Sequence, residues 1–158
     1  TLIATTHGFG KGLASSGGIL CTHPSVVSAI VNTSRAFIFT TAPSPLAIFA
    51  AREAWETSQT DHARSNHLFA LCKDFASGLK SLGWVLPERE IATPIFPLMC
   101  GGLDASVQAS EKLAQSNIYL RPIRPPTVPA GSERLRATIT ADLQRDDLNE
   151  FLGVLREL

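Results

Sequence analysis

The chain has 158 residues, of which 44% are hydrophobic and 18% are charged, and this composition is that of a globular protein rather than a disordered segment. Lysine plus arginine and aspartate plus glutamate number 14 each, so the net charge is zero, which argues against a general affinity for nucleic acid or for an anionic membrane. No apolar run approaches membrane-spanning length and no signal peptide is visible, so we expect a cytoplasmic protein.

The first third of the chain predicts strands and helices around a glycine-rich loop. We expect a short buried strand over residues 2–6 and a second strand over 18–21, on either side of the stretch HGFGKGLASS. A helix is predicted to open at His23-Pro24-Ser25, because proline suits a first helical turn. A further helix is predicted from about Pro45 to Thr57, after the turn residues 42–45.

The polar segment 58–65 is the best candidate for a boundary, and it divides the chain into domains 1–58 and 59–158. Apolar residues at three- and four-residue steps then predict a long helix ending at Gly83; they are Leu68, Leu71, Cys72, Phe75, Leu79 and Leu82. Strands are predicted over 95–99, 118–121 and 135–140, with a helix over 105–115 between the first two. A last helix carries Leu148, Phe151, Leu152 and Leu155 on one face. The second domain is therefore predicted to be an α+β lobe.

Residues that could hold a metal or form disulfides are sparse. Cys21, Cys72 and Cys100 are far apart, odd in number and without CxxC spacing, which predicts buried free thiols and no zinc site. His62 and His67 do not fit an HExxH pattern. We therefore expect no metal.

The glycine-rich loop places Lys11 between Gly10 and Gly12. It does not fit a P-loop, because Thr5 and Gly12 stand where that motif needs glycine and a hydroxyl residue. It does not fit a dinucleotide fingerprint either, because the last glycine or alanine of that motif is replaced by Leu13. A lysine can trap a carbonyl compound where its surroundings lower its pKa. Spacing alone still favours an ordinary surface turn for this loop.

Several segments, in the same order along the chain, resemble the α-oxoamine synthase family of pyridoxal-phosphate-dependent enzymes of fold type I. They are Gly8-Phe-Gly-Lys-Gly12, Ser16-Gly-Gly18, Arg35-Ala-Phe-Ile-Phe-Thr-Thr41, Ile123-Arg-Pro-Pro-Thr-Val-Pro129 and Arg134-Leu-Arg136. The string IRPPTVP favours the branch that makes 8-amino-7-oxononanoate in biotin biosynthesis. The resemblance implies the α/β tail of a fold-type-I large domain over 1–58, followed by an α+β C-terminal small domain over 59–158.

The resemblance also implies roles for five residues. Lys11 matches the catalytic lysine that binds pyridoxal 5'-phosphate, and Thr40 and Thr41 match the stretch near the cofactor phosphate of a neighbouring subunit, which implies a homodimer. Thr127 matches a substrate-contacting threonine, and Arg136 matches the arginine that holds the carboxylate of the amino acid. A departure from the family pattern is Gly8, which stands where members usually have a phosphate-binding threonine.

The implied reaction is the decarboxylative condensation of L-alanine with pimeloyl-CoA or pimeloyl carrier protein. Another α-oxoamine synthase, with a different amino acid or acyl thioester, remains an alternative, as does a non-catalytic dimerisation lobe. Members of the family are more than twice as long, and the chain begins without methionine. We therefore expect a fragment that is inactive alone, with residues that complete the site lying upstream.

Overall fold

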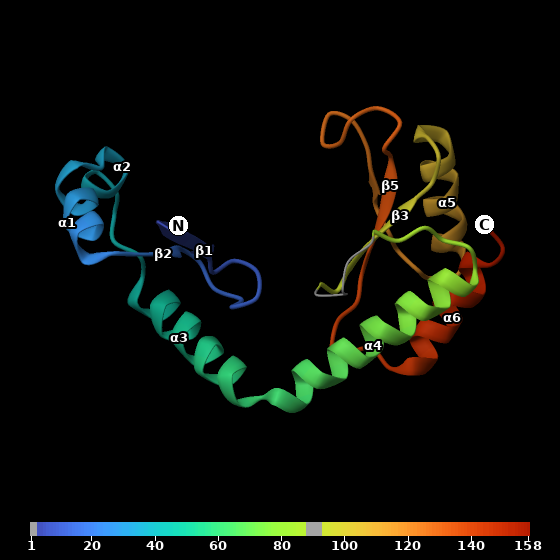
Figure 1. The fold of residues 1–158 in the computed structure, drawn as a ribbon, viewed down its shortest axis with the longest axis horizontal. Helices are drawn as coiled ribbons and strands as arrows, with labels where there is room; N and C mark the ends of the chain where they lie inside the picture. The colour runs from blue at the N-terminus through green and yellow to red at the C-terminus, as the bar shows by residue number, and fades with distance from the viewer. Residues whose placement is uncertain (1–2, 88–92) are drawn as a thin grey trace. The chain divides into compact units, whose positions relative to one another are not determined.

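The computed structural model describes residues 3–87 and 93–158, and Figure 1 shows their helices and strands. The elements are β1 (Ala4–Gly8), β2 (Gly18–Thr22), α1 (Pro24–Thr33), α2 (Arg35–Ile38), α3 (Pro45–Thr60), α4 (His62–Ser81), β3 (Ile95–Met99), α5 (Leu103–Gln115), β4 (Pro122–Ile123), β5 (Arg134–Thr138) and α6 (Arg145–Leu155). By their contacts the residues form two compact units, Thr1–His62 and Ala63–Leu158. No helix in the described ranges combines the length and the apolar character needed to cross a membrane.

The first unit begins with an antiparallel hairpin in which β1 pairs with β2, from Ala4 opposite Thr22 to Gly8 opposite Gly18. Both predicted strands are present, but the prediction that the first is buried is wrong for its described residues, while Leu2 lies outside them. Cys21, predicted as a buried thiol, is likewise exposed. The cause is that this two-stranded sheet carries no covering layer among the described residues of its unit.

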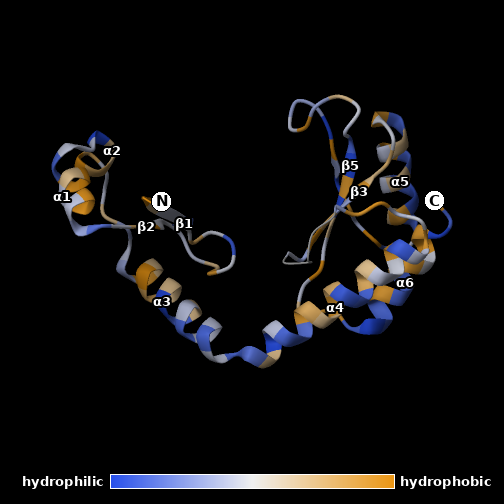
Figure 2. Ribbon diagram, in the orientation of Figure 1, coloured by the Kyte–Doolittle hydropathy of each residue, from blue (hydrophilic) through white to orange (hydrophobic). Residues whose placement is uncertain are grey.

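The helices of the first unit follow the predicted signals. Pro24 occupies the first turn of α1, and the Ser25 amide donates to Nδ1 of His23 at 3.3 Å, which caps the helix. The helix α3 begins at Pro45 as predicted and continues to Thr60, three residues beyond the expected end. Figure 2 shows apolar residues along α1 and at the start of α3. Many of them are exposed, among them Val27, Val31, Leu46 and Phe49, and so are Phe37 of α2 and Phe39, which follows it.

The second unit contains a three-stranded antiparallel sheet in the order β3–β5–β4. Along β5, Leu135 and Ala137 are buried, whereas Arg136 and Thr138 are exposed, as the alternation of side chains along a strand requires. The buried residues pack with apolar residues of α4, α5 and α6 into one core, so these helices cover one face of the sheet and leave the other open (Figure 1). The prediction of an α+β lobe is confirmed.

The centre of this core is Phe75 of α4. Its ring meets Phe96 of β3 edge to face and stacks on Phe151 of α6, with both centroids 5.1 Å away. The helix α4 ends before Gly83, whose φ of +85° favours glycine, and the Trp84 amide donates to the Leu79 carbonyl at 3.0 Å. The predicted end of this helix is therefore confirmed.

The predicted strand over 118–121 is wrong. The Ile118 amide donates to the Leu113 carbonyl at 3.0 Å, and the Leu120 carbonyl accepts from Oγ of Ser110 at 2.6 Å. These two backbone groups therefore bond to α5 rather than to a sheet. The ladder begins only at Pro122, and β4 has two residues.

Candidate functional site

Lys11 lies in the loop that connects β1 to β2. The Phe9 amide donates to the Gly17 carbonyl at 2.9 Å, and the Ser15 amide donates to the Phe9 carbonyl at 3.1 Å. The Ala14 amide donates to the Lys11 carbonyl at 3.0 Å, which makes Lys11 the first residue of a tight turn. Three backbone hydrogen bonds thus hold the loop, and Oγ of Ser15 ties it to the Ala47 carbonyl of α3 at 2.6 Å.

The glycines around Lys11 fall into two kinds. Gly17 has φ +106°, and a Cβ on Gly18 would lie 2.9 Å from the His7 carbonyl oxygen, so both positions need glycine to close the hairpin. A Cβ on Gly8 or Gly12 would meet no heavy atom within 4 Å. The lysine side chain is exposed. The amine therefore stands on a closed loop, and the backbone on either side of it leaves room for a ligand.

Thr40 and Thr41 follow α2 and precede α3, and both are exposed. Oγ of Thr40 makes only a long contact, 3.4 Å, with the Thr41 carbonyl. Within their unit the two hydroxyl groups are therefore accessible to an acceptor such as a phosphate.

Thr127 and Arg136 line one cavity of about 560 Å³ on the open face of the sheet in the second unit. Arg136 comes from β5, and Thr127 comes from the proline-rich loop before it, where the Thr127 amide donates to the Arg124 carbonyl at 3.0 Å. The other lining residues are Leu86, Pro87, Thr93, Ile95, Phe96, Pro97, Ile123, Val128 and Arg134. The structure thus brings together two of the five predicted site residues, while Lys11, Thr40 and Thr41 belong to the other unit.

This cavity is mostly apolar and carries positive charge. Arg134 and Arg136 line it, and no acidic side chain is among the lining residues that the structure describes. Nε of Arg134 donates to the Ser132 carbonyl at 2.8 Å, which fixes the position of that guanidinium. A planar guanidinium can bind a carboxylate through two parallel hydrogen bonds. The cavity therefore suits a molecule that has both a carboxylate and an apolar part.

Sequence reasoning included Arg134 in a motif but gave it no role in the site. The signal is the pair Arg134-Leu-Arg136, since residues two apart on a strand lie on the same face. Ile95 of β3 was predicted within a strand but not as part of a site, and only the pairing of β3 with β5 brings it to this cavity.

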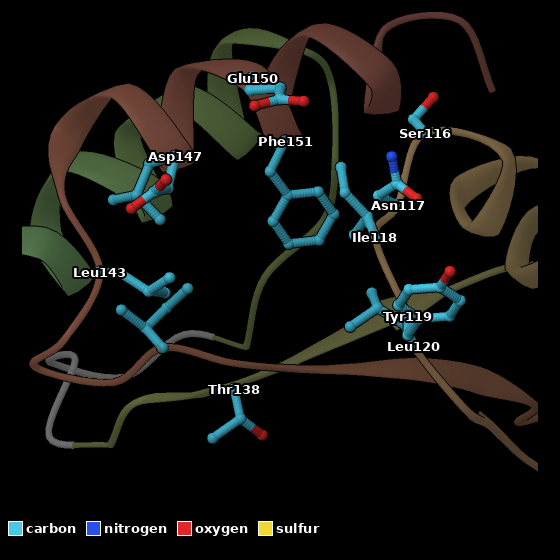
Figure 3. A pocket seen from close by; sticks show the side chains of 12 residues that line it. Ser116, Asn117, Ile118, Tyr119, Leu120, Thr138, Leu143, Asp147, Glu150 and Phe151 are labelled. Carbon is cyan, nitrogen blue, oxygen red and sulfur yellow. The ribbon is translucent and has the colours of Figure 1, made fainter.

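A second cavity, of about 350 Å³, lies between α6 and the segment that follows α5, and Figure 3 shows Phe151 pointing from α6 into it. Asp147 and Glu150 line it, and no lysine or arginine is among the described residues that do. Oδ2 of Asp147 accepts from the Gln144 amide at 2.7 Å, so this carboxylate helps to cap α6. The negative charge at this cavity disfavours an anionic substrate.

Two of the three cysteines, Cys72 and Cys100, are weak candidates for other chemistry, and the residue types that bind metals form no cluster in the part of the chain that the structure describes. Burial raises the pKa of the Cys72 thiol and of the Cys100 thiol, which keeps both protonated at neutral pH and therefore weakly nucleophilic. Among residues 3–87 and 93–158, no three histidine, cysteine, aspartate or glutamate side chains come together to hold a metal ion.

Comparison with known proteins identifies the family. The family model for aminotransferase class I and II matches residues 2–155. A protein of Anaeromyxobacter dehalogenans, 8-amino-7-oxononanoate synthase, is 36% identical over 146 residues, which cover 92% of this chain and 36% of the relative. The chain thus spans little more than a third of the length of that relative.

Two solved structures show the same fold. A structure of SPT with PLP superposes with a TM-score of 0.90 at 24% sequence identity, over 99% of this chain and 39% of that one. The 8-amino-7-oxononanoate synthase of Francisella tularensis gives a TM-score of 0.85 at 18% identity, over 98% of this chain and 45% of that one. The predicted fold class is confirmed. Because the family model matches nearly the whole sequence, the chain belongs to the aminotransferase class I and II family.

Proposed function

We propose that the protein is an α-oxoamine synthase that uses pyridoxal 5'-phosphate to condense L-alanine with pimeloyl-CoA or pimeloyl carrier protein, with loss of carbon dioxide, giving 8-amino-7-oxononanoate. The observation that carries the proposal is the 36% identity over 146 residues to a relative called 8-amino-7-oxononanoate synthase. The cavity that Thr127 and Arg136 share supports it, because an amino acid brings a carboxylate to such a site.

The residues around Lys11 fit pyridoxal phosphate. Its amine is exposed on a loop closed by backbone hydrogen bonds, and a Cβ at Gly8 or Gly12 would meet nothing, so a planar ring can approach the lysine closely. An SPT structure with the same fold was solved with PLP. When bound, this cofactor draws electrons away from Cα of an amino acid and makes its proton removable.

Lys11 has two tasks in this proposal. Its Nζ would hold pyridoxal phosphate when the cofactor is bound. As a free amine, the same group would take the proton from Cα of the amino acid, which is the work of a general base. The hydrogen-bonded loop keeps the amine within reach throughout both steps.

Arg136 and Thr127 bind the amino acid. The guanidinium of Arg136 holds the carboxylate through paired hydrogen bonds, and the hydroxyl of Thr127 donates a further one. The apolar walls around them, which include Ile95 and Val128, exclude water from the substrate. A carboxylate held in this way fixes the orientation of the amino acid, including the bonds to its Cα.

Thr40 and Thr41 donate hydrogen bonds to the cofactor phosphate of the neighbouring subunit, so the active protein is a homodimer. Support comes from the exposed aromatic side chains of Phe37 and Phe39, which directly precede these threonines. Exposed apolar residues grouped in this way favour a protein–protein contact.

The cofactor assignment is tested by absorbance. The full-length protein mixed with pyridoxal phosphate is expected to develop a visible absorbance band from the lysine-bound cofactor, and Lys11→Ala is expected to lack it. The matched control is Lys73→Ala, which removes an exposed lysine on α4 and should keep the band. Identical spectra for Lys11→Ala and the unchanged protein would refute this role.

The substrates are tested by product analysis. L-alanine, glycine and L-serine are each offered with a panel of acyl thioesters, and the aminoketone is identified by mass spectrometry. The proposal expects the highest turnover with L-alanine and a pimeloyl thioester. A clear preference for another pair would assign the protein to a different α-oxoamine synthase, and a complete lack of turnover would favour a non-catalytic role.

A further inference from the structure

The open face of the sheet has a smaller cavity beside the cavity that Thr127 and Arg136 line. It has a volume of about 310 Å³ and is lined by Tyr119, Leu120, Arg121, Ile123, Arg136 and Thr138. Ile123 and Arg136 also line the larger cavity, so the two cavities adjoin at these residues. Arg121 belongs only to the smaller one.

The smaller cavity brings Arg121 and Arg136 together, because both residues line it. Arg121 directly precedes Pro122, which pairs with Leu135, the neighbour of Arg136 on β5. Like charges that share one site disfavour each other. A pair of this kind is more stable when an anion lies between or beside the two guanidinium groups.

The protein itself supplies no such anion in the ranges 3–87 and 93–158. Among the lining residues that the structure describes, neither cavity has an aspartate or a glutamate, and two ion pairs of the described residues join other partners, Arg52 with Glu56 and Arg145 with Asp74. The Arg121 side chain is exposed, which leaves it accessible to a ligand.

We propose that Arg121 determines specificity for the acyl thioester by binding an anionic group that this substrate carries away from its thioester carbon. The inference rests on the proposed function, in which the larger cavity and Arg136 take the carboxylate of the amino acid. Arg121 then stands in the adjoining cavity, where Leu120 and Ile123 offer an apolar wall to a methylene chain. Two anions fit this description: the distal carboxylate of a dicarboxylic acyl chain, and a phosphate of coenzyme A or of a carrier's phosphopantetheine.

Steady-state kinetics of Arg121→Ala in the full-length holoenzyme test the proposal. A hydrogen-bonded charge lost from a binding site weakens the interaction by about tenfold to a hundredfold. We therefore expect kcat/KM for pimeloyl-CoA to fall by about that factor, with KM for L-alanine unchanged and with partial recovery in Arg121→Lys. Arg156→Ala is the control, because it removes an exposed arginine that lines neither cavity.

Three thioesters distinguish the two sources of the anion. Pimeloyl-CoA carries both anions, octanoyl-CoA carries only the phosphates, and the pimeloyl thioester of N-acetylcysteamine carries only the carboxylate. If kcat/KM of Arg121→Ala falls for the first and third thioesters, relative to the unchanged protein, Arg121 binds the carboxylate. If it falls for the first and second, Arg121 binds a phosphate. If Arg121→Ala and the unchanged protein have the same kcat/KM for each of the three thioesters, the proposal is overturned. A rise in KM for L-alanine alone would also overturn it.

A binding measurement separates this inference from the proposed reaction. Calorimetric titration of the protein with pimelate and with coenzyme A needs no turnover, and at least one of these probes is expected to bind Arg121→Ala about tenfold more weakly or worse. If the protein turns over no thioester but this difference is found, the reaction is wrong and the anion site stands. If neither probe binds, or both bind the two proteins equally, the anion site is refuted.

Discussion

Arg136 is the residue at which the two cavities of the open sheet face meet, and its position follows from simple strand geometry. It lies between Leu135 and Ala137, which are completely buried against the helices, so its own side chain must point to the opposite face. The packing of the core thus sets the face of the sheet from which the Arg136 side chain extends.

Replacing Arg136 with lysine tests whether paired hydrogen bonds matter at this position. Lysine keeps the charge but loses the planar fork, so we expect KM for L-alanine to rise about tenfold or more. Steady-state kinetics with L-alanine as the varied substrate measure this, and Arg156→Lys serves as the control. An unchanged KM for L-alanine in Arg136→Lys would mean that the amino-acid carboxylate binds elsewhere.

At the residue scale the sequence predicts less about the site than about the fold. The loop around Lys11 is visible in the glycines, yet spacing alone cannot distinguish a surface turn from a ligand site. Thr127 and Arg136 share a cavity because β5 lies beside β3 and near the proline-rich loop, and this tertiary pairing has no local signal. The roles of all five predicted site residues, Lys11, Thr40, Thr41, Thr127 and Arg136, stay predictions.

At the scale of elements, Gly78 of α4 lies directly against the Leu152 side chain of α6. A Cβ added at Gly78 of α4 would overlap Cδ1 of Leu152 and lie 3.2 Å from its Cγ. The whole end of the leucine side chain would therefore have to move. Gly78 thus leaves room for Leu152 of α6 against the backbone of α4, in spite of the low helix propensity of glycine.

We predict that Gly78→Ala destabilises the protein by about 1–2 kcal/mol, because overpacking costs more than the gain in helix propensity. The matched control is Gly153→Ala on α6, where an added Cβ meets nothing within 4 Å, so this variant should be neutral or slightly more stable. Urea denaturation followed by circular dichroism measures both. A Gly78→Ala variant as stable as Gly153→Ala would show that α6 can shift away without cost.

Most elements could be predicted because their signals are local. Apolar steps of three and four residues predicted α4, and the apolar face made by Leu148, Phe151, Leu152 and Leu155 predicted α6. The segment 118–121 was misread because its apolar residues resemble a strand, while its backbone groups bond to α5. The hydrogen-bond partner, and not the side-chain pattern, decided the structure there.

At the scale of the whole molecule, buried apolar residues are distributed unevenly between the two units. Among the described residues, only Phe9 and Ala51 of the buried apolar set belong to the first unit, and the remainder form the cluster around Phe75 in the second. Since burial of apolar surface is the main stabilising contribution to folding, most of the stability should reside in residues 63–158.

We therefore predict that residues 63–158 fold on their own and unfold cooperatively in urea, whereas residues 1–62 show no cooperative transition. Circular dichroism of the two separate segments measures this. Phe75→Ala in the segment 63–158 should lower its stability by about 3–5 kcal/mol, since it removes the ring at the centre of the core. A cooperative transition in residues 1–62 would contradict this view of the stability.

The polar segment 58–65 was the candidate boundary in the sequence. The contacts in the structure divide the chain between His62 and Ala63. The assignment of residues 1–58 to a cofactor domain stays a prediction. The exposure of the β1–β2 hairpin could not be foreseen from its residues, because an apolar strand sequence predicts burial without saying what covers it.

The most direct test of the account identifies the lysine that carries the cofactor. Full-length protein saturated with pyridoxal phosphate is reduced with borohydride, digested and mapped by mass spectrometry. The account predicts a pyridoxyl group on Lys11 at about one per chain, with Lys73, Lys80 and Lys112 unmodified. A pyridoxyl group on another lysine, with Lys11 recovered intact, would contradict it.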